Sequence, residues 1–146
     1  MKHLFSTTDS TVTFGDVTLD RLIIYCSCPM SIGDRELNAK RGIDLAQAAL
    51  EEGYIPIVPA LSYWWNKEWN NSYSMWLCMD LGLLMIADAL IYLEGPSVGV
   101  EVEKAFAREY HIPIVTSIRE LNEIKESLLS KKMNCGTAKE YAAELI

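Results

Sequence analysis

The fold of this chain is decided by Ala89-Leu-Ile-Tyr-Leu-Glu-Gly-Pro-Ser-Val-Gly-Val-Glu-Val-Glu-Lys-Ala-Phe-Ala107. Its first five residues are apolar and predict a buried strand, and the Gly, Pro and Ser residues that follow predict a loop. Helical spacing of apolar residues after Ser97 predicts a helix. In open α/β sheets, ligands bind beyond the carboxyl ends of the strands, often against a helix N-terminus. We therefore expect the functional site in this strand–loop–helix unit.

Strands and helices alternate along the rest of the chain. Strands are predicted at residues 21–27, 54–59 and 111–116, and helices at 35–52, 73–86 and 118–129. The first strand is rich in β-branched and aromatic residues without polar alternation, which is typical of a parallel strand buried on both faces. The alternation predicts an α/β fold, a doubly wound parallel sheet in three α/β/α layers of the Rossmann-like or flavodoxin-like kind.

The length of the chain favours a single domain over residues 1–146. Residues 1–20 form an N-terminal extension, in which a hairpin is predicted to turn at Gly15-Asp16. A capping box that begins at Thr137 predicts a C-terminal helix within residues 131–146.

The composition excludes several classes of partner. The formal net charge is −7, which argues against a nucleic-acid polymer because such binding needs a basic face. The longest apolar run, Leu81 to Leu93, is interrupted by Asp88 and is too short to cross a bilayer, so no membrane partner is expected. With no secretory leader at the start, we expect a cytoplasmic protein whose four cysteines are reduced thiols. Cys26-Ser-Cys28 has no second pair at zinc spacing, so we predict neither a metal nor a cofactor.

Residues suited to chemistry lie near several predicted strand ends. Tyr25 begins the segment Tyr-Cys-Ser-Cys-Pro-Met30 at the end of the first strand. Asp80 and Asp88 are eight residues apart and project from a similar side of one helix. We expect Asp88 to have a structural role at the helix end. Asp80 either faces solvent or occupies a polar cavity, because burial of an unpaired charge is costly.

The helix after the Gly/Pro/Ser loop carries two further candidates. Ser97, with Gly95 and Gly99 on either side, is placed to cap the helix, and such a loop is also an anion site. Glu103 lies near the helix N-terminus, where a negative charge stabilises the helix by interacting with its dipole. On the residues alone, this structural role is favoured over a catalytic one.

Taken together, these motifs resemble the nucleoside 2-deoxyribosyltransferase superfamily over residues 23–115. That group includes nucleoside 5′-monophosphate N-glycosidases and small phage-associated relatives. The first motif resembles the family's opening Tyr-x-x-Gly-Pro strand, and Asp80 with Asp88 has the spacing of its two aspartates. The stretch from Ser97 to Ala107 resembles the Ser-x-Gly-x-x-x-Glu-x-x-x-Ala signature.

The resemblance implies an enzyme that cleaves or transfers the N-glycosidic bond of a (deoxy)nucleoside or nucleoside 5′-monophosphate by retaining double displacement. In that scheme Glu103 is the nucleophile, Asp80 engages the sugar or protonates the leaving base, and Tyr25 orients the reacting groups. A homodimer or larger homo-oligomer is also implied. The residues expected to contact substrate are Ser27, Cys28, Pro29, Met30, Arg35, Trp64, Trp65, Gly95, Ser97 and Gly99.

Three features depart from the family pattern. Cys28 stands where relatives carry glycine and narrows the space beside a ligand. Glu101 adds a carboxylate two residues before Glu103, and it becomes the nucleophile if the register shifts by two. Arg35 and Arg41 are candidates for a phosphate-binding cation, which leaves open whether the substrate carries a phosphate.

Residues 60–74, predicted as a loop, are dense in aromatic side chains. These rings, with Trp76, suit either stacking on a nucleobase or burial in a subunit interface, and we favour an interface with one or two rings lining the site. Two non-catalytic functions are also consistent with the sequence. One is a nucleotide-binding sensor or regulatory module that uses the same pocket, and the other is a structural oligomer.

Overall fold

The computed structural model describes residues 5–8 and 10–134. Its centre is a parallel sheet of four strands in the order β5-β4-β6-β7. The strands are β4 (Ile23–Ser27), β5 (Ile55–Ile57), β6 (Ala89–Tyr92) and β7 (Ile114–Val115). Because β5 and β6 flank β4 on opposite sides, the chain order reverses between β4 and β6. The carboxyl ends of these two strands are therefore the switch point at which open α/β sheets bind ligands.

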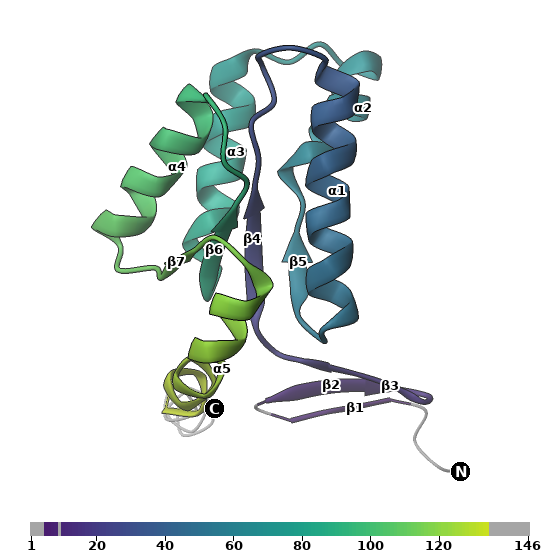
Figure 1. Ribbon diagram of the computed structural model, residues 1–146. Coiled ribbons are helices and arrows are strands. Elements are labelled where there is room, and N and C mark those ends of the chain that lie inside the picture. The colour runs from purple at the N-terminus through teal and green to yellow at the C-terminus, as the bar shows by residue number, and fades with distance from the viewer. Residues whose placement is uncertain (1–4, 9, 135–146) are drawn as a thin grey trace, which may run out of the picture.

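Helices cover both faces of this sheet (Figure 1). On one face lie α1 (Arg35–Glu51) and α5 (Ile118–Asn134), and on the other lie α3 (Tyr73–Met85) and α4 (Val98–Glu109). Successive side chains of β4 enter different cores, because side chains alternate across a strand. Ile24 and Cys26 pack with α1 and α5, whereas Tyr25 packs with α3 and α4. The predicted three-layer α/β/α architecture is confirmed.

The prediction of a loop over residues 60–74 is wrong. A 3-10 turn, η1 (Pro59–Leu61), leads into α2 (Ser62–Glu68), and α3 already begins at Tyr73. Pro59 favours this start, since its fixed φ suits the first helical position. The α2 segment contains neither Gly nor Pro, the residues that most often interrupt a helix. Its aromatic residues were therefore no reason to expect a loop.

The N-terminal extension is a separate antiparallel sheet of β1 (Phe5–Thr7), β2 (Thr11–Phe14) and β3 (Val17–Asp20). The predicted hairpin is confirmed, with Gly15 at φ 62° in its turn. Figure 1 shows this small sheet at the amino end of β4, away from the switch point. The helix predicted at 118–129 continues to Asn134 in α5, and the C-terminal helix predicted to begin at Thr137 lies outside the described residues.

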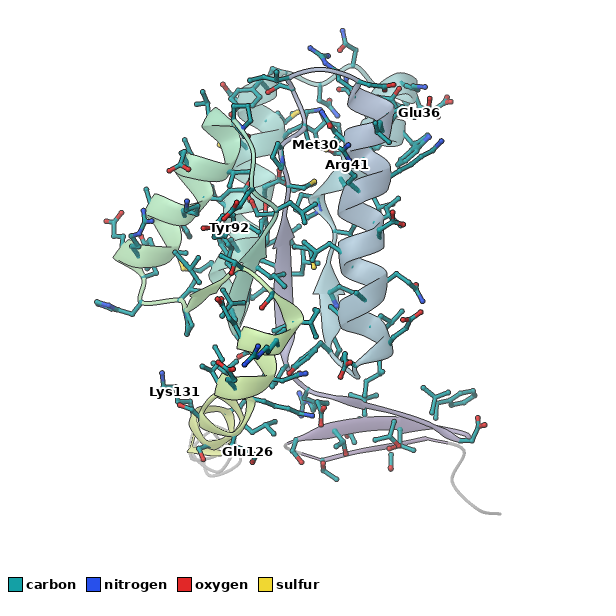
Figure 2. The ribbon with its side chains drawn as sticks, in the orientation of Figure 1. Met30, Glu36, Arg41, Tyr92, Glu126 and Lys131 are labelled. Carbon is teal, nitrogen blue, oxygen red and sulfur yellow. The ribbon has the colours of Figure 1, made fainter. Side chains whose placement is uncertain are left out.

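Side chains follow the layers. The labelled charged residues Glu36, Glu126 and Lys131 point away from the sheet in Figure 2 and are exposed. Met30 instead packs against a small core near the carboxyl end of β4, formed by Cys28 with residues of α1 and η1. In the part of the chain that the structure describes, we find no helix with both the length and the hydropathy to span a membrane.

Candidate active site

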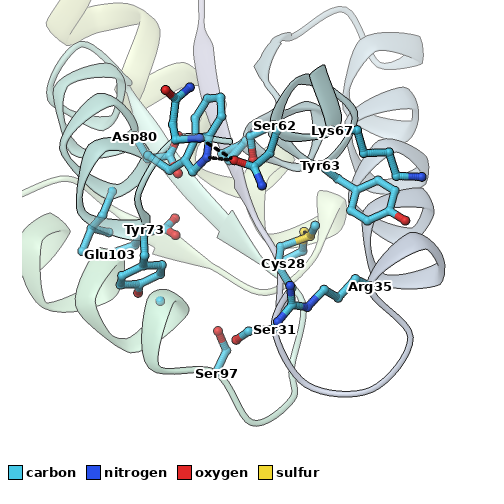
Figure 3. A pocket seen from close by; sticks show the side chains of 17 residues that line it. Cys28, Ser31, Arg35, Ser62, Tyr63, Lys67, Tyr73, Asp80, Ser97 and Glu103 are labelled. Carbon is cyan, nitrogen blue, oxygen red and sulfur yellow. Dashed lines mark hydrogen bonds between the residues drawn. The ribbon is translucent and has the colours of Figure 1, made fainter. Parts of the chain in front are cut away.

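A cavity of about 480 Å³ opens at the carboxyl ends of β4 and β6. Its walls come from the loop after β4, the start of α1, from η1, α2 and α3, and from the start of α4 (Figure 3). The lining residues are Cys28, Met30, Ser31, Arg35, Pro59, Ser62, Tyr63, Asn66, Lys67, Asn71, Tyr73, Trp76, Leu77, Asp80, Ser97, Gly99 and Glu103. The cavity thus forms where the strand–loop–helix unit was expected to hold a ligand.

Three polar side chains gather around Glu103, and we call the four residues together the polar cluster: Tyr25, Ser27, Asp80 and Glu103. Asp80 and Glu103 line the cavity, and Tyr25 and Ser27 are buried on β4. The Tyr25 and Ser27 hydroxyls, one Asp80 oxygen and one Glu103 oxygen are inaccessible, and none has a hydrogen-bond partner among the described residues. Tyr25 and Ser27 are two residues apart on β4, so both point to the face that carries α3 and α4. More than about 90% of buried polar groups in folded proteins are paired. Four unpaired groups together indicate a place built for a ligand or for water.

Burial sets the protonation of the two carboxyls. It raises the pKa of Glu103 to about 7. The negative charge of Asp80 adds to this rise, and the nearby Tyr25 and Ser27 hydroxyls oppose it. Burial likewise raises the pKa of Asp80 to about 7. The pKa of the Tyr25 hydroxyl is raised by burial and by the same two carboxyls, so that it stays a neutral donor. The two hydroxyls lie near Glu103 without forming hydrogen bonds of ordinary geometry with it.

The position of Glu101 decides the register of the α4 motif. Its side chain is 67% exposed and pairs with the Lys104 ammonium at 3.2 Å, whereas Glu103 is only 7% exposed. Two residues turn a helix by about 200°, so only one of these glutamates can face the sheet. Glu101 therefore stays in solvent, and Glu103 is the one that reaches the cavity.

Most of the residues predicted to bind substrate lie at or beside the cavity. Ser97 caps α4 by accepting a hydrogen bond from the Val100 N–H at 3.2 Å, and its side chain also lines the cavity. Those that line the cavity directly are Cys28, Met30, Arg35, Ser97 and Gly99. Pro29 and Gly95 instead line a smaller neighbouring cavity of about 140 Å³, with Arg41. Gly95 has φ 146°, and a Cβ there would lie 3.0 Å from the Pro29 ring, so the two loops approach closely only because this residue is glycine.

Trp64 and Trp65 do not line the cavity, and the reason is that their segment is helical. In α2, residues 62, 63, 66 and 67 share the side that faces the cavity, which turns the two tryptophans away. Trp64 packs against the small core around Cys28, and Trp65 makes an edge-to-face contact with Trp76 at 5.1 Å between ring centroids.

The residues that sequence analysis missed also follow helical spacing. On α3, residues 73, 76, 77 and 80 line the cavity together. Asn66 joins α2 to α3, because its side-chain oxygen accepts from the Trp76 ring N–H at 2.7 Å and from the Asn71 backbone N–H at 3.0 Å. Asn66 and Lys67 follow Ser62 and Tyr63 at helical spacing, and this spacing could have indicated that all four line one side of a helix. It indicates this only if α2 is a helix.

Asp88 has the structural role expected of it. Its carboxylate accepts from the Ile23 backbone N–H at 2.7 Å and pairs with the Lys132 ammonium at 2.6 Å. It thereby ties the end of α3 to β4 and α5, on the side of the sheet away from the cavity lining. Of the two aspartates, only Asp80 lines the cavity.

Two cations line the cavity along with the two carboxyls. Arg35 and Lys67 make no ion pair with a carboxylate of the described residues, and the Lys67 ammonium lies 4.6 Å from the centroid of the Tyr63 ring. In residues 5–8 and 10–134, no three His, Cys, Asp or Glu side chains gather in a way that would hold a metal ion. The cavity lining therefore offers two carboxyls and two cations to a ligand, and the buried Tyr25 and Ser27 hydroxyls lie close to one of the carboxyls, Glu103.

Comparison of the chain with protein-family models, with curated proteins and with solved structures gave no match. What the fold and site define is a class: a doubly wound α/β protein with a cavity at its switch point, the place where such sheets bind ligands.

Proposed function

We propose that this chain is an enzyme that cleaves or transfers the N-glycosidic bond of a (deoxy)nucleoside or a nucleoside 5′-monophosphate. The observation that carries the proposal is the polar cluster, in which two carboxyls that line one cavity and two buried hydroxyls each have an oxygen without a hydrogen-bond partner among the described residues. The order and spacing of the motifs that hold these residues, which resemble the deoxyribosyltransferase pattern, support the same reaction.

The surroundings of the two carboxyls suggest how they share the work. Burial raises the pKa of Glu103, and the Tyr25 and Ser27 hydroxyls oppose that rise and so favour the ionised form. Asp80 has no such hydroxyl beside it, and burial raises its pKa and favours the protonated form. Because the pKa of each carboxyl is about 7, the pair carries about one proton between them near neutral pH, and one carboxylate with one acid is the combination that retaining glycosidases use.

The reaction takes two steps. First, a Glu103 oxygen bonds to the anomeric carbon while the bond from that carbon to the base nitrogen breaks, and the departing base takes the electron pair and a proton from Asp80. Second, water or another base bonds to the same carbon, the ester bond to Glu103 breaks, and Asp80 takes the proton from the attacking group. The nearby Tyr25 and Ser27 hydroxyls favour the ionised form of Glu103, which is the form that attacks in the first step and leaves in the second.

The cations of the cavity favour a substrate that carries a negative charge. Arg35 presents a planar guanidinium suited to phosphate, and Lys67 adds a second positive charge from α2. Ser97 and Gly99, at the start of α4, line the same cavity and suit the same group. A cytoplasmic location suits such metabolism and the free thiols of Cys26, Cys28 and Cys78.

A panel of ribo- and deoxynucleosides and their 5′-monophosphates tests the proposal, with release of free base followed by chromatography, with and without an acceptor base. We expect turnover of at least one member and a fall of at least about 10³-fold in Glu103→Gln. Glu101→Gln, on the same helix but in solvent, is the matched control and keeps full activity. Equal activity in the Glu103→Gln variant would exclude the assigned nucleophile.

The unpaired cations also favour a second function, binding of an anionic nucleotide without turnover, as in a sensor. Calorimetric titration with the same panel separates the two. Tight binding of a monophosphate that is lost in Arg35→Ala, with no base released over long incubation, would favour the sensor.

A further inference from the structure

Asn66, on the α2 wall of the cavity, carries a hydrogen-bond donor of fixed orientation. Its side-chain oxygen accepts from the Trp76 ring N–H at 2.7 Å and from the Asn71 backbone N–H at 3.0 Å. Both of these partners can only donate, so the amide oxygen has to face them and the amide cannot turn over. The amide NH2 group has no acceptor among the described residues and is not sealed from solvent. Since Asn66 lines the cavity, this donor is available to a ligand.

Asn66 lies across the cavity from the carboxyl that is assigned to attack the sugar. Figure 3 shows Glu103 on one side of the cavity and the α2 residues Tyr63 and Lys67 on the other. Asn66 belongs to the same helix and lines the cavity with them. When a sugar is held at Glu103, its base therefore extends toward α2. The Watson–Crick edge of the base is the edge farthest from the sugar, so it is the edge that reaches Asn66.

The bonds that hold Asn66 also place it near the proposed acid. Its partner Trp76 lies four residues before Asp80, which is about one turn of α3, and both line the cavity. In the proposed reaction Asp80 protonates the departing base. A base that takes its proton from Asp80 is therefore within the part of the cavity that Trp76 and Asn66 enclose.

We propose that Asn66 selects a base with a carbonyl oxygen on its Watson–Crick edge over a base with an amino group there. Hypoxanthine, guanine, uracil and thymine belong to the first class, and adenine and cytosine to the second. The inference rests on the proposed function, because that function holds the sugar at Glu103. The fixed N–H donor of Asn66 pairs with a carbonyl oxygen, whereas an amino group sets donor against donor and leaves both unpaired. The Asn71 side chain also lines the cavity, and its amide oxygen suits the ring N–H beside such a carbonyl.

Two pairs of substrates test the selection, since the members of each pair differ at this edge. They are deoxyinosine and deoxyadenosine monophosphate, and deoxyuridine and deoxycytidine monophosphate. We expect kcat/KM to be at least about tenfold higher for the carbonyl member of a pair. Asn66→Asp keeps an oxygen for the Trp76 and Asn71 N–H groups and replaces the donor by an acceptor. It should reverse the preference, so that the ratio of the two kcat/KM values changes by at least about 100-fold.

Ser62→Ala is the matched control, because Ser62 lines the cavity from the same helix and its hydroxyl either donates or accepts. This variant should leave the ratio within each pair unchanged. Far-UV circular dichroism checks that Asn66→Asp is folded. If it is not, Trp76→Phe replaces it, since loss of the ring N–H frees the amide of Asn66 to turn and should bring the ratio toward one.

Calorimetric titration with the same four nucleotides separates failure of this inference from failure of the proposed function. A carbonyl preference in Kd that Asn66→Asp reverses, with no base released from any nucleotide, would uphold the selection and refute the reaction. Base release with the same ratio in wild type and Asn66→Asp would overturn the selection and leave the reaction standing. Absence of both binding and turnover for all four nucleotides would also overturn it.

Discussion

Replacing Glu103 by glutamine should stabilise the protein in the absence of substrate, and should do so only where the wild-type carboxyl is ionised. Burial lifts the pKa of Glu103 from its ordinary value of 4.5 to about 7. A change of this size corresponds to about 3 kcal/mol of unfolding free energy. Glutamine has a similar shape and cannot ionise, so it removes this cost.

The pH dependence has a definite sign. The folded protein holds the Glu103 proton more tightly than the unfolded chain does, because the folded pKa is the higher one. Wild-type stability therefore falls as the pH rises from 4.5 through about 7, and the cost is complete near pH 8. We expect Glu103→Gln to match wild type near pH 4 and to exceed it by up to about 3 kcal/mol near pH 8.

Urea unfolding followed by far-UV circular dichroism measures this difference at a series of pH values. Glu101→Gln is the matched control, since Glu101 lies on the same helix with an exposed side chain and should show a small change at every pH. A Glu103→Gln variant that is less stable than wild type near pH 8 would contradict the expectation. It would mean that the Glu103 carboxylate already has a satisfactory partner in the folded protein.

Three other outcomes follow from the same contacts. A pH–rate profile should show turnover that peaks near pH 7, where one cavity carboxyl is ionised and the other protonated. Asp80→Asn should lower the rate of turnover and should remove the decline of that rate at high pH. Gly42→Ala should cost about 1–3 kcal/mol in urea unfolding despite its better helix propensity, because the new Cβ would lie 2.6 Å from the Cys28 sulfur and 2.7 Å from the Ala60 Cβ. If the double change Cys28→Ala and Ala60→Gly restores none of the loss, these contacts are not the cause. Asp88→Ala should lower the free energy of unfolding by about 1–3 kcal/mol because it leaves the Ile23 N–H unpaired. Asp80→Asn should leave the free energy of unfolding unchanged or higher. If thermal unfolding gives the reverse order, the roles assigned to the two aspartates are exchanged.

The chain's local patterns were sufficient to predict the order of elements in the main sheet. The apolar segment at Ala89, the Gly/Pro/Ser loop and the cap at Ser97 appear in the structure as β6, a loop and the start of α4. Such signals are local, because strand and helix propensity, caps and turns depend on residues close in sequence. The position of the cavity also followed, since the carboxyl ends of parallel strands lie at the same edge of a sheet.

Local patterns failed where helix formation depended on packing. The aromatic residues of α2 were interpreted as a loop, so Trp64 and Trp65 were assigned to the ligand, whereas Asn66 and Lys67 were overlooked. Once the segment is a helix, its periodicity alone selects which side chains face the cavity. The missing information was the core beneath α2, which joins Ala60 to Cys28 and Ala39 from distant parts of the chain.

The sequence alone thus determined that Asp80 and Glu103 are candidate carboxyls near a switch point. Only the tertiary structure decided that Glu103 is buried while Glu101 is in solvent, and that Asp80 faces the cavity while Asp88 binds a strand end. It also placed Tyr25 and Ser27 beneath them, from a strand more than fifty residues earlier. The physical reason is that ionisation depends on burial and on neighbouring groups, and both are set by contacts between segments far apart in the sequence.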